Sequence, residues 1–189
     1  MKKANLILGQ LLCAFTYRDK LHFIHLYKVY VRCHLEYAVQ SWSPYLQQDK
    51  NLIEDVQKRA IRQVSGLQGS YEEKLAQVGL TTLIDRRARG DFIQTYKIMH
   101  QVDDIPVETF FKAAGEGHEH ALRGAVIISE EGETKNMNLS IPETNCRTLD
   151  LRRYSFSHRV VNPWNNLPDE VKFAESVNQF KNLYDDHMK

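Results

Sequence analysis

The stretch over residues 26–45 constrains the fold most, because it concentrates apolar and aromatic side chains more densely than the rest of the chain. That density exceeds what one exposed amphipathic face supplies. The stretch is therefore predicted to be buried on most of its circumference, with Trp42 as a structural ring near its end. It holds no nucleophile with a base, no metal-ligand set and no phosphate loop. Its apolar members are Leu26, Tyr27, Val29, Tyr30, Val31, Leu35, Tyr37, Ala38, Val39 and Trp42.

Apolar side chains recur at helical spacing along much of the chain, which predicts a mainly α fold. Pro44 is expected to end the second helix, and Asp49 is expected to cap the third. Ser70 and Glu73 have the spacing of a capping box. The predicted helices cover residues 3–15, 21–42, 49–64, 70–79, 82–100 and 176–184.

The composition divides the chain into three parts. Residues 1–111 are expected to form a helical bundle. Residues 112–146 mix glycine, glutamate, histidine and asparagine, which predicts a long flexible loop. Residues 147–189 are expected to form a small C-terminal unit ending in a helix. Within this unit, residues 162–168 are predicted to be a turn built around Trp164, a structural anchor.

Charge and cysteine usage narrow the classes of function. A net charge of +1 over 189 residues gives no general attraction to nucleic acid or to a membrane, so any such binding depends on local patches. The three cysteines are widely spaced, which argues against a disulfide framework and fits a reducing compartment. No apolar run reaches the roughly 18 residues that a membrane span needs. The chain is therefore expected to be intracellular, in the nucleus or the cytoplasm, with no membrane partner.

Histidines and acidic pairs do not make a catalytic site. His22 and His25 lie on one expected helix, but zinc needs about three or four converging ligands, and neither C-x-x-C nor H-E-x-x-H is present. The pairs Asp103-Asp104 and Asp185-Asp186 do not lie between apolar strands that would direct them at catalytic metals. No catalytic residue, metal or cofactor is predicted.

Two clusters of arginines are the most suggestive polar feature. One lies on the long helix over residues 82–100, and the other falls where Tyr154, Phe156 and His158 are interleaved. Cations beside aromatic rings suit a nucleic-acid backbone with stacked bases. Alternatively, helix arginines pair with nearby acids such as Asp85 and Asp91. The candidate nucleic-acid-binding residues are Arg86, Arg87, Arg89, Arg147, Arg152, Arg153 and Arg159.

A series of short motifs, taken together and in order, carries a family resemblance. The series resembles the region downstream of the polymerase palm in the non-LTR (LINE-type, jockey-like) retrotransposon reverse transcriptases. It covers most of the chain outside about residues 112–146, and the family usually has proline where this chain has Cys33. The motifs include His34-Leu35-Glu36-Tyr37-Ala38-Val39-Gln40, Val56-Gln57-Lys58-Arg59-Ala60, Tyr71-Glu72-Glu73, Arg86-Arg87-x-Arg89-Gly90-Asp91, Arg152-Arg153-Tyr154-Ser155-Phe156 and Trp164-Asn165-x-Leu167-Pro168.

The resemblance implies a thumb-like bundle and the tail beyond it, from the C-terminal portion of an RNA-directed DNA polymerase. In the family, the catalytic Tyr/Phe-Ala-Asp-Asp motif and the endonuclease lie upstream of the matching region. The chain is therefore not expected to be an enzyme on its own. At most, the resemblance implies binding of a template–primer, as RNA or an RNA–DNA hybrid. The alternative is a domesticated or non-functional helical module that binds protein, and the oligomeric state is left open.

Overall fold

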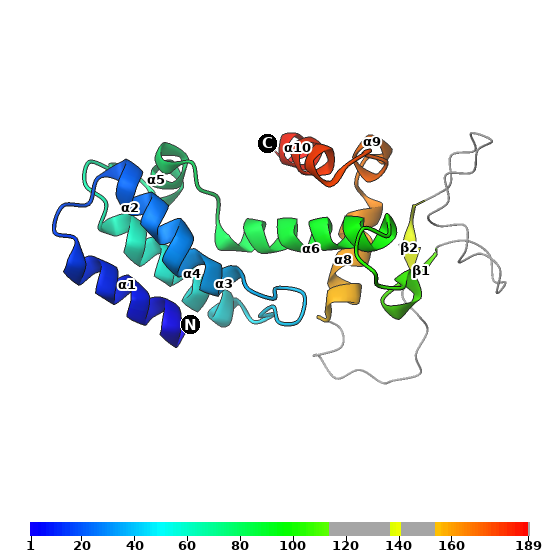
Figure 1. The fold of residues 1–189 in the computed structure, drawn as a ribbon, viewed down its shortest axis with the longest axis horizontal. Coiled ribbons are helices and arrows are strands. Elements are labelled where there is room, and N and C mark those ends of the chain that lie inside the picture. Colours follow the sequence, from blue (N-terminus) through cyan, green and yellow to red (C-terminus); the bar gives the residue numbers. More distant parts are fainter. Residues whose placement is uncertain (114–136, 141–153, 189) are drawn as a thin grey trace. The chain divides into compact units, whose positions relative to one another are not determined.

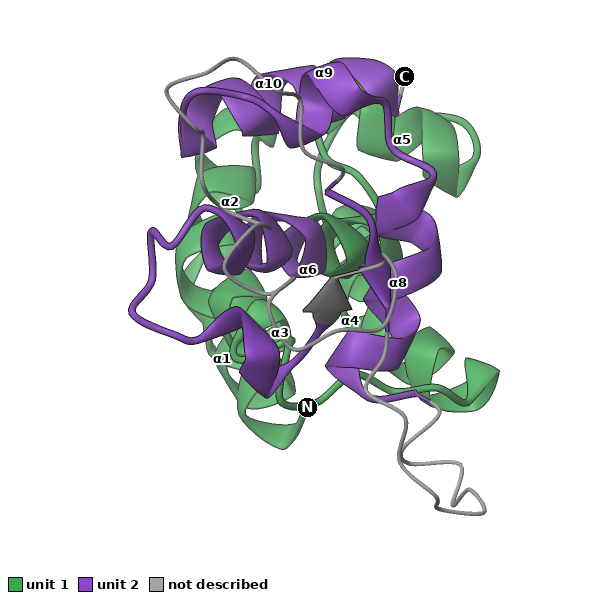
Figure 2. Cartoon of the chain, turned by 90° about the vertical axis from the view of Figure 1, so that its right-hand side faces the viewer, with its two compact units in different colours: residues 1–89 green, residues 90–189 purple. Residues whose placement is uncertain are grey.

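The computed structural model describes residues 1–113, 137–140 and 154–188 (Figure 1). The fold is mainly α-helical, as the sequence predicts. The chain divides into two compact units, residues 1–89 and residues 90–189 (Figure 2). The division falls inside helix α6 (Leu83–Met99), whereas the sequence analysis placed the end of the first part at residue 111.

The first unit is a set of packed helices. In one continuous helical run, the π-helix η1 (Tyr27–Arg32) joins α2 (Lys20–Leu26) to α3 (Cys33–Glu36). Helix α1 (Lys2–Ala14) packs along this run and against α4 (Gln47–Arg62). Helix α5 (Tyr71–Val78) packs against α2 and α4 and precedes α6.

The core of the first unit follows the helical spacing of its apolar residues. Ala4 and Leu8 lie one turn apart on α1 and are fully buried, as are Tyr27 and Val31 on η1. Burial of each large apolar side chain stabilises the fold by about 1.5–3 kcal/mol. The core also contains Phe23, Ile24, Leu35, Ile53, Val56, Ala60, Ile61, Val64, Leu75, Val78, Leu80 and Leu83.

The prediction that residues 26–45 are buried on most of their circumference is wrong. Only one side of this stretch faces the core, and Tyr30 and Tyr37 lie on the exposed side. The expected continuation of the second helix toward Trp42 is also wrong, because the helix ends at Glu36. Tyr37 is extended and Ala38 has a φ of 50°, so the backbone leaves the helix well before Pro44.

Most of the predicted helix caps are present. The Ser70 Oγ accepts from the Glu73 backbone N–H at 3.2 Å, and the Glu73 carboxylate accepts from the Ser70 N–H at 2.8 Å, which confirms the capping box. Asp49 is not the cap of α4, because the helix begins two residues earlier with Leu46 in the cap position. Asp49 instead lies in the first turn, where its negative charge interacts favourably with the positive end of the helix dipole.

The second unit joins the rest of α6 to the C-terminal helices. After α6 come the 3-10 helix η2 (Val107–Thr109) and the short strand β1 (Lys112–Ala113), which pairs antiparallel with β2 (Leu139–Ser140). Three helices follow: α8 (Phe156–Asn165), α9 (Asp169–Lys172) and α10 (Val177–His187). Ser176 caps α10 by accepting from the Gln179 N–H, as predicted.

Aromatic rings form the core of the second unit. The Trp164 ring is fully buried and lies 6.0 Å from the Phe180 ring, measured between centroids. Tyr96 of α6 stacks on Phe180 at 4.5 Å, and Phe92 lies 5.0 Å from Tyr184. These contacts place the second half of α6 with the C-terminal helices, which is why the unit boundary precedes residue 111.

Trp164 is an anchor but not a turn residue. The predicted turn over residues 162–168 is wrong at its start, because α8 continues through Pro163 to Asn165. The Trp164 Nε1 donates to the Met137 carbonyl at 3.0 Å, and Asn165 exchanges two hydrogen bonds with the Leu139 backbone. These bonds fix β2 on α8. Of the predicted loop over residues 112–146, the part at 114–136 and 141–146 lies outside the described residues.

Candidate functional site

The first candidate arginine, Arg86, makes an internal ion pair. Its guanidinium meets the Glu36 carboxylate through two nitrogens, with Nη2 at 3.0 Å from Oε2. Arg32 lies 3.4 Å from the same carboxylate. Burial lowers the pKa of Arg32, and the neighbouring charge of Arg86 lowers it further. Two guanidiniums therefore share one carboxylate, and this half-buried triad has a net positive charge.

The second candidate, Arg87, is only 6% exposed. It donates hydrogen bonds to the carbonyl oxygens of Leu35 and Trp42, the second at 3.4 Å. Its guanidinium carbon lies 4.2 Å from the centroid of the Trp42 ring, a cation–π contact. These bonds tie the start of α6 to the segment that follows α3. Arg89, two residues further along α6, is half-buried.

In the second unit, Arg159 is also engaged internally. Its Nε and Nη2 lie 2.7 and 2.9 Å from the two carboxylate oxygens of Asp91, whose side chain is 7% exposed. A third bond goes to the Tyr154 carbonyl at 3.3 Å. The other three candidates, Arg147, Arg152 and Arg153, lie outside the described residues.

The structure thus pairs Arg86, Arg87 and Arg159 with carboxylates or backbone carbonyl groups inside their own units. The alternative that the helix arginines pair with the nearby acids Asp85 and Asp91 is wrong in its partners, because Asp85 is bonded to Thr82 and Asp91 pairs with Arg159 of α8. The partner of Arg86 is instead Glu36, which is 50 positions away in the sequence. Local sequence gives no signal for such a partner, because the fold alone brings the two residues together.

The exposed cations of the first unit lie elsewhere, and the sequence analysis did not select them as candidates. Arg59 and Arg62 lie on the last turn of α4, and neither has an ion-pair partner among the described residues. Arg62 is exposed and Arg59 remains accessible to solvent on the same side. Their spacing with Asp55 marks the outward face of the helix. Lys58, beside them, pairs with Asp55 at 3.6 Å and lies 5.6 Å from the Tyr71 ring centroid.

Charge is divided unevenly between the two units. Residues 1–89 contain 14 Lys and Arg against 8 Asp and Glu, a formal charge of +6. Residues 90–189 contain 11 Lys and Arg against 16 Asp and Glu, a formal charge of −5. The near-neutral net charge of the whole chain is therefore the sum of a basic first unit and an acidic second unit. A basic unit attracts polyanions by a field that the total charge does not reveal.

A buried polar network lies at the junction of α4, α5 and α6. Glu54 accepts from the Leu83 backbone N–H at 2.9 Å and from the Tyr71 hydroxyl. Gln57 is fully buried, accepts from the Tyr27 hydroxyl at 2.9 Å and donates to the Thr81 carbonyl at 3.0 Å. Burial raises the pKa of both tyrosines, so their hydroxyls stay protonated as donors. Since these polar groups are mutually satisfied, the network fixes three helices and does not form a reactive site.

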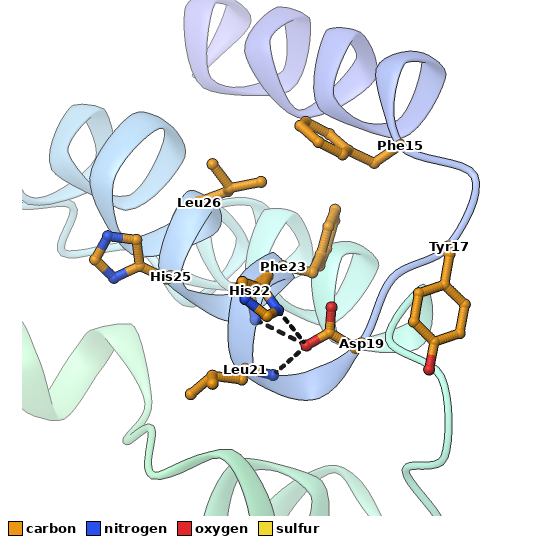
Figure 3. Close-up of a pocket in the computed structure, with 8 residues that line it drawn as sticks. All are labelled: Phe15, Tyr17, Asp19, Leu21, His22, Phe23, His25 and Leu26. Carbon is orange, nitrogen blue, oxygen red and sulfur yellow. Dashed lines mark hydrogen bonds and ion pairs between the residues drawn. The ribbon is translucent and has the colours of Figure 1, made fainter.

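A cavity near the end of α1 is lined mainly by apolar side chains (Figure 3). It has a volume of about 550 Å³ and is lined by Phe15 after α1, by Leu21, Phe23 and Leu26 from α2, and by rim residues that include Asp19 and His22. Asp19 caps α2 by accepting from the backbone N–H groups of Leu21 and His22, and the His22 backbone bond lowers the pKa of Asp19 most. Among the described residues that line this cavity, none is a serine, threonine or cysteine that His22 could activate.

Metal-ligating side chains do not form a cluster in the described parts of the chain. No group of three or more His, Cys, Asp and Glu there is placed to hold a metal ion. Asp103 accepts from Gln94 at 2.7 Å and lies 3.5 Å from Lys97, so it is engaged with the end of α6. Within the same described ranges, no helix is both long and apolar enough to cross a membrane.

Comparison of the chain with protein families, with curated proteins and with solved structures gives no match.

Proposed function

We propose that this chain is the C-terminal, thumb-like portion of an RNA-directed DNA polymerase of the non-LTR retrotransposon type, and that its first unit binds nucleic acid without polymerising. The observation that supports binding most directly is the charge of +6 on residues 1–89. The motif series noted in the sequence supports the retrotransposon origin. A mainly helical first unit agrees with a thumb.

The cations that contact phosphate are proposed to be the accessible ones on α4. Arg59 and Arg62 lie on one face of the last turn of this helix and reach solvent. Arg86, Arg87 and Arg159 are assigned a structural role, because each already binds a carboxylate or backbone carbonyls. Accessible arginines have the geometry to grip phosphate oxygens without leaving a buried acid unpaired.

Binding of a protein partner is the second candidate, and the apolar cavity favours it. Phe15, Tyr17 and Leu21 are exposed at its edge, so a partner with a small apolar side chain has a place to insert. Binding of a protein partner through this apolar cavity is expected to be insensitive to salt, whereas binding of nucleic acid is expected to weaken as the salt concentration rises.

The deciding experiment measures the affinity of the full chain for an RNA–DNA hybrid over a series of salt concentrations. The proposal predicts that the logarithm of the affinity falls linearly with the logarithm of the salt concentration. Arg59→Gln with Arg62→Gln should reduce the slope by about 0.7–0.9 for each phosphate that the protein no longer neutralises. Absence of salt-sensitive binding at low ionic strength contradicts the proposal.

Lys181→Gln on α10 is the control for a change of charge outside the first unit, since it removes one positive charge from the acidic second unit. The slope should stay at the wild-type value in this variant. Primer extension on an RNA template completes the test. The chain contains no Tyr/Phe-Ala-Asp-Asp motif, so no template-dependent incorporation is expected with any divalent metal. Incorporation by the pure chain would overturn the assignment of a non-catalytic portion.

A further inference from the structure

The Trp42 ring is fixed at the surface of the first unit. It remains 40% exposed, although its Nε1 donates to the Tyr37 carbonyl at 2.8 Å. The guanidinium of Arg87 lies against the ring at 4.2 Å, and Arg87 is itself held by the Leu35 carbonyl. The indole is therefore anchored through both its nitrogen and its π system, yet a large part of it stays in contact with water.

The backbone around Trp42 is also constrained. Ala38 has a φ of 50°, a left-handed conformation that side chains other than glycine adopt at a cost. The Ala38 carbonyl accepts from the backbone N–H groups of Ser41 and Trp42, at 3.0 and 3.2 Å. Strained conformations that persist in a rigid turn are concentrated at functional sites. Tyr37, whose carbonyl holds the indole, has a side chain that is 76% exposed.

The charge beside these rings is positive. Glu36, next to Tyr37 in the chain, is shared between Arg32 and Arg86, so one carboxylate faces two guanidiniums. The wider unit carries +6. Exposed aromatic rings within a positive field match a ligand with flat rings on a negatively charged backbone. That description fits unpaired nucleotides, whose bases have free π faces, better than an intact duplex, whose bases are stacked on each other.

We infer that Trp42 and Tyr37 form a stacking surface for the unpaired bases of single-stranded nucleic acid. This inference rests on the proposed function, and it names the form of ligand and the residues that touch its bases. Arg87 acts as a positioning residue that holds the indole. Because stacking on aromatic rings tolerates any base, the surface is expected to bind with little sequence preference.

The test titrates the full wild-type chain with a short unstructured oligonucleotide and with an abasic oligonucleotide of the same length. Anisotropy of a label on the oligonucleotide reports binding, and tryptophan emission reports stacking. Trp164 is fully buried, so quenching by a bound base reports Trp42. The expected results are quenching with the base-bearing strand only and about tenfold weaker binding of the abasic strand.

Substitutions at the ring sharpen the test. Trp42→Leu should weaken binding of the base-bearing strand about tenfold and leave the affinity for the abasic strand unchanged, whereas Trp42→Phe should retain most of the affinity. Tyr17→Leu removes another ring of the same unit, which is 77% exposed, and should leave binding unchanged. The comparison of the two strands with the wild type stands even if a variant folds poorly.

The outcomes separate the two proposals. Equal affinity for both strands without quenching overturns the stacking surface and leaves the proposed phosphate binding intact. Failure of both single strands to bind at low salt overturns the stacking surface, and the proposed phosphate binding is overturned as well only if the RNA–DNA hybrid also fails to bind. Stronger binding of a duplex than of either single strand also contradicts the stacking surface, because paired bases cannot reach the rings.

Discussion

The two units place their tryptophans in opposite environments. In the second unit, Trp164 is fully buried in a stack with other rings, and the unit as a whole is acidic. In the first unit, Trp42 and Tyr37 stay at the surface, and the unit is basic. The difference teaches that an aromatic-rich segment is not by itself a core. Whether its rings are enclosed depends on which side of the segment faces the core.

The largest expected difference between the units concerns the two tryptophans. Trp164→Ala should lower the free energy of unfolding by about 3–5 kcal/mol, because it leaves a cavity among the rings of the second unit. Trp42→Ala should cost about 1 kcal/mol or less, because the ring is already partly in water. Denaturant unfolding of both variants measures the contrast. Equal losses of stability would break the comparison.

The next effect concerns the ion pair of the second unit. Arg159→Gln should destabilise the chain by about 3 kcal/mol, because the buried Asp91 carboxylate loses its cation. Adding Asp91→Asn should recover part of the loss, since no buried charge then remains unpaired. Chemical denaturation of the single and double variants is the measurement. A single variant as stable as the wild type would show that the pair is solvated.

A smaller loss is expected in the polar network of the first unit. Glu54→Ala should cost about 2–3 kcal/mol, because the Leu83 N–H and the Tyr71 hydroxyl lose their acceptor. Glu54→Gln keeps one acceptor oxygen and should cost less. Unfolding curves give the loss of stability in each variant. A larger loss for Glu54→Gln than for Glu54→Ala would contradict this account of the network.

The smallest effect is a dependence on pH in the second unit. Burial lowers the pKa of His100, whose Nε2 donates to the Lys172 carbonyl at 2.9 Å. The unfolded chain then takes up a proton at a higher pH than the folded chain, so stability should fall as the pH drops below about 6.5. His100→Gln should reduce this part of the slope. The measurement compares the unfolding midpoints of the wild type and His100→Gln between neutral and mildly acidic pH. If the variant lost stability with falling pH as steeply as the wild type, the pH dependence would come from other groups.

Local signals in the sequence predicted much of the helical structure. The cap formed by Ser70 and Glu73 and the cap at Ser176 depend on residues three positions apart, and both are confirmed. The end of the second helix was predicted wrongly. The prediction relied on Pro44, whereas the helix ends before Ala38, which takes a left-handed conformation. Alanine favours helices, and the bonds from Arg87 to the Leu35 and Trp42 carbonyls on either side of Ala38 are contacts that the local sequence does not predict.

The candidate site was less predictable than the fold. The cluster of arginines on α6 could be identified from sequence, but the role of Arg86 depends on Glu36 and that of Arg159 depends on Asp91, which lies 68 positions away. The helical spacing of Arg59 and Arg62 predicts their place on the outward face of α4, although they were not selected as binding candidates. The uneven charge could have been found by dividing the chain near residue 89 instead of residue 111.

The central claim is that accessible arginines of the first unit bind nucleic acid while the arginines with internal partners maintain the fold. The most direct test compares Arg59→Gln with Arg159→Gln, two identical changes of charge, by the salt dependence of hybrid binding. The account predicts that Arg59→Gln lowers the slope by about 0.7–0.9 and leaves stability unchanged, whereas Arg159→Gln lowers stability and leaves the slope unchanged. The reverse pattern would contradict the account.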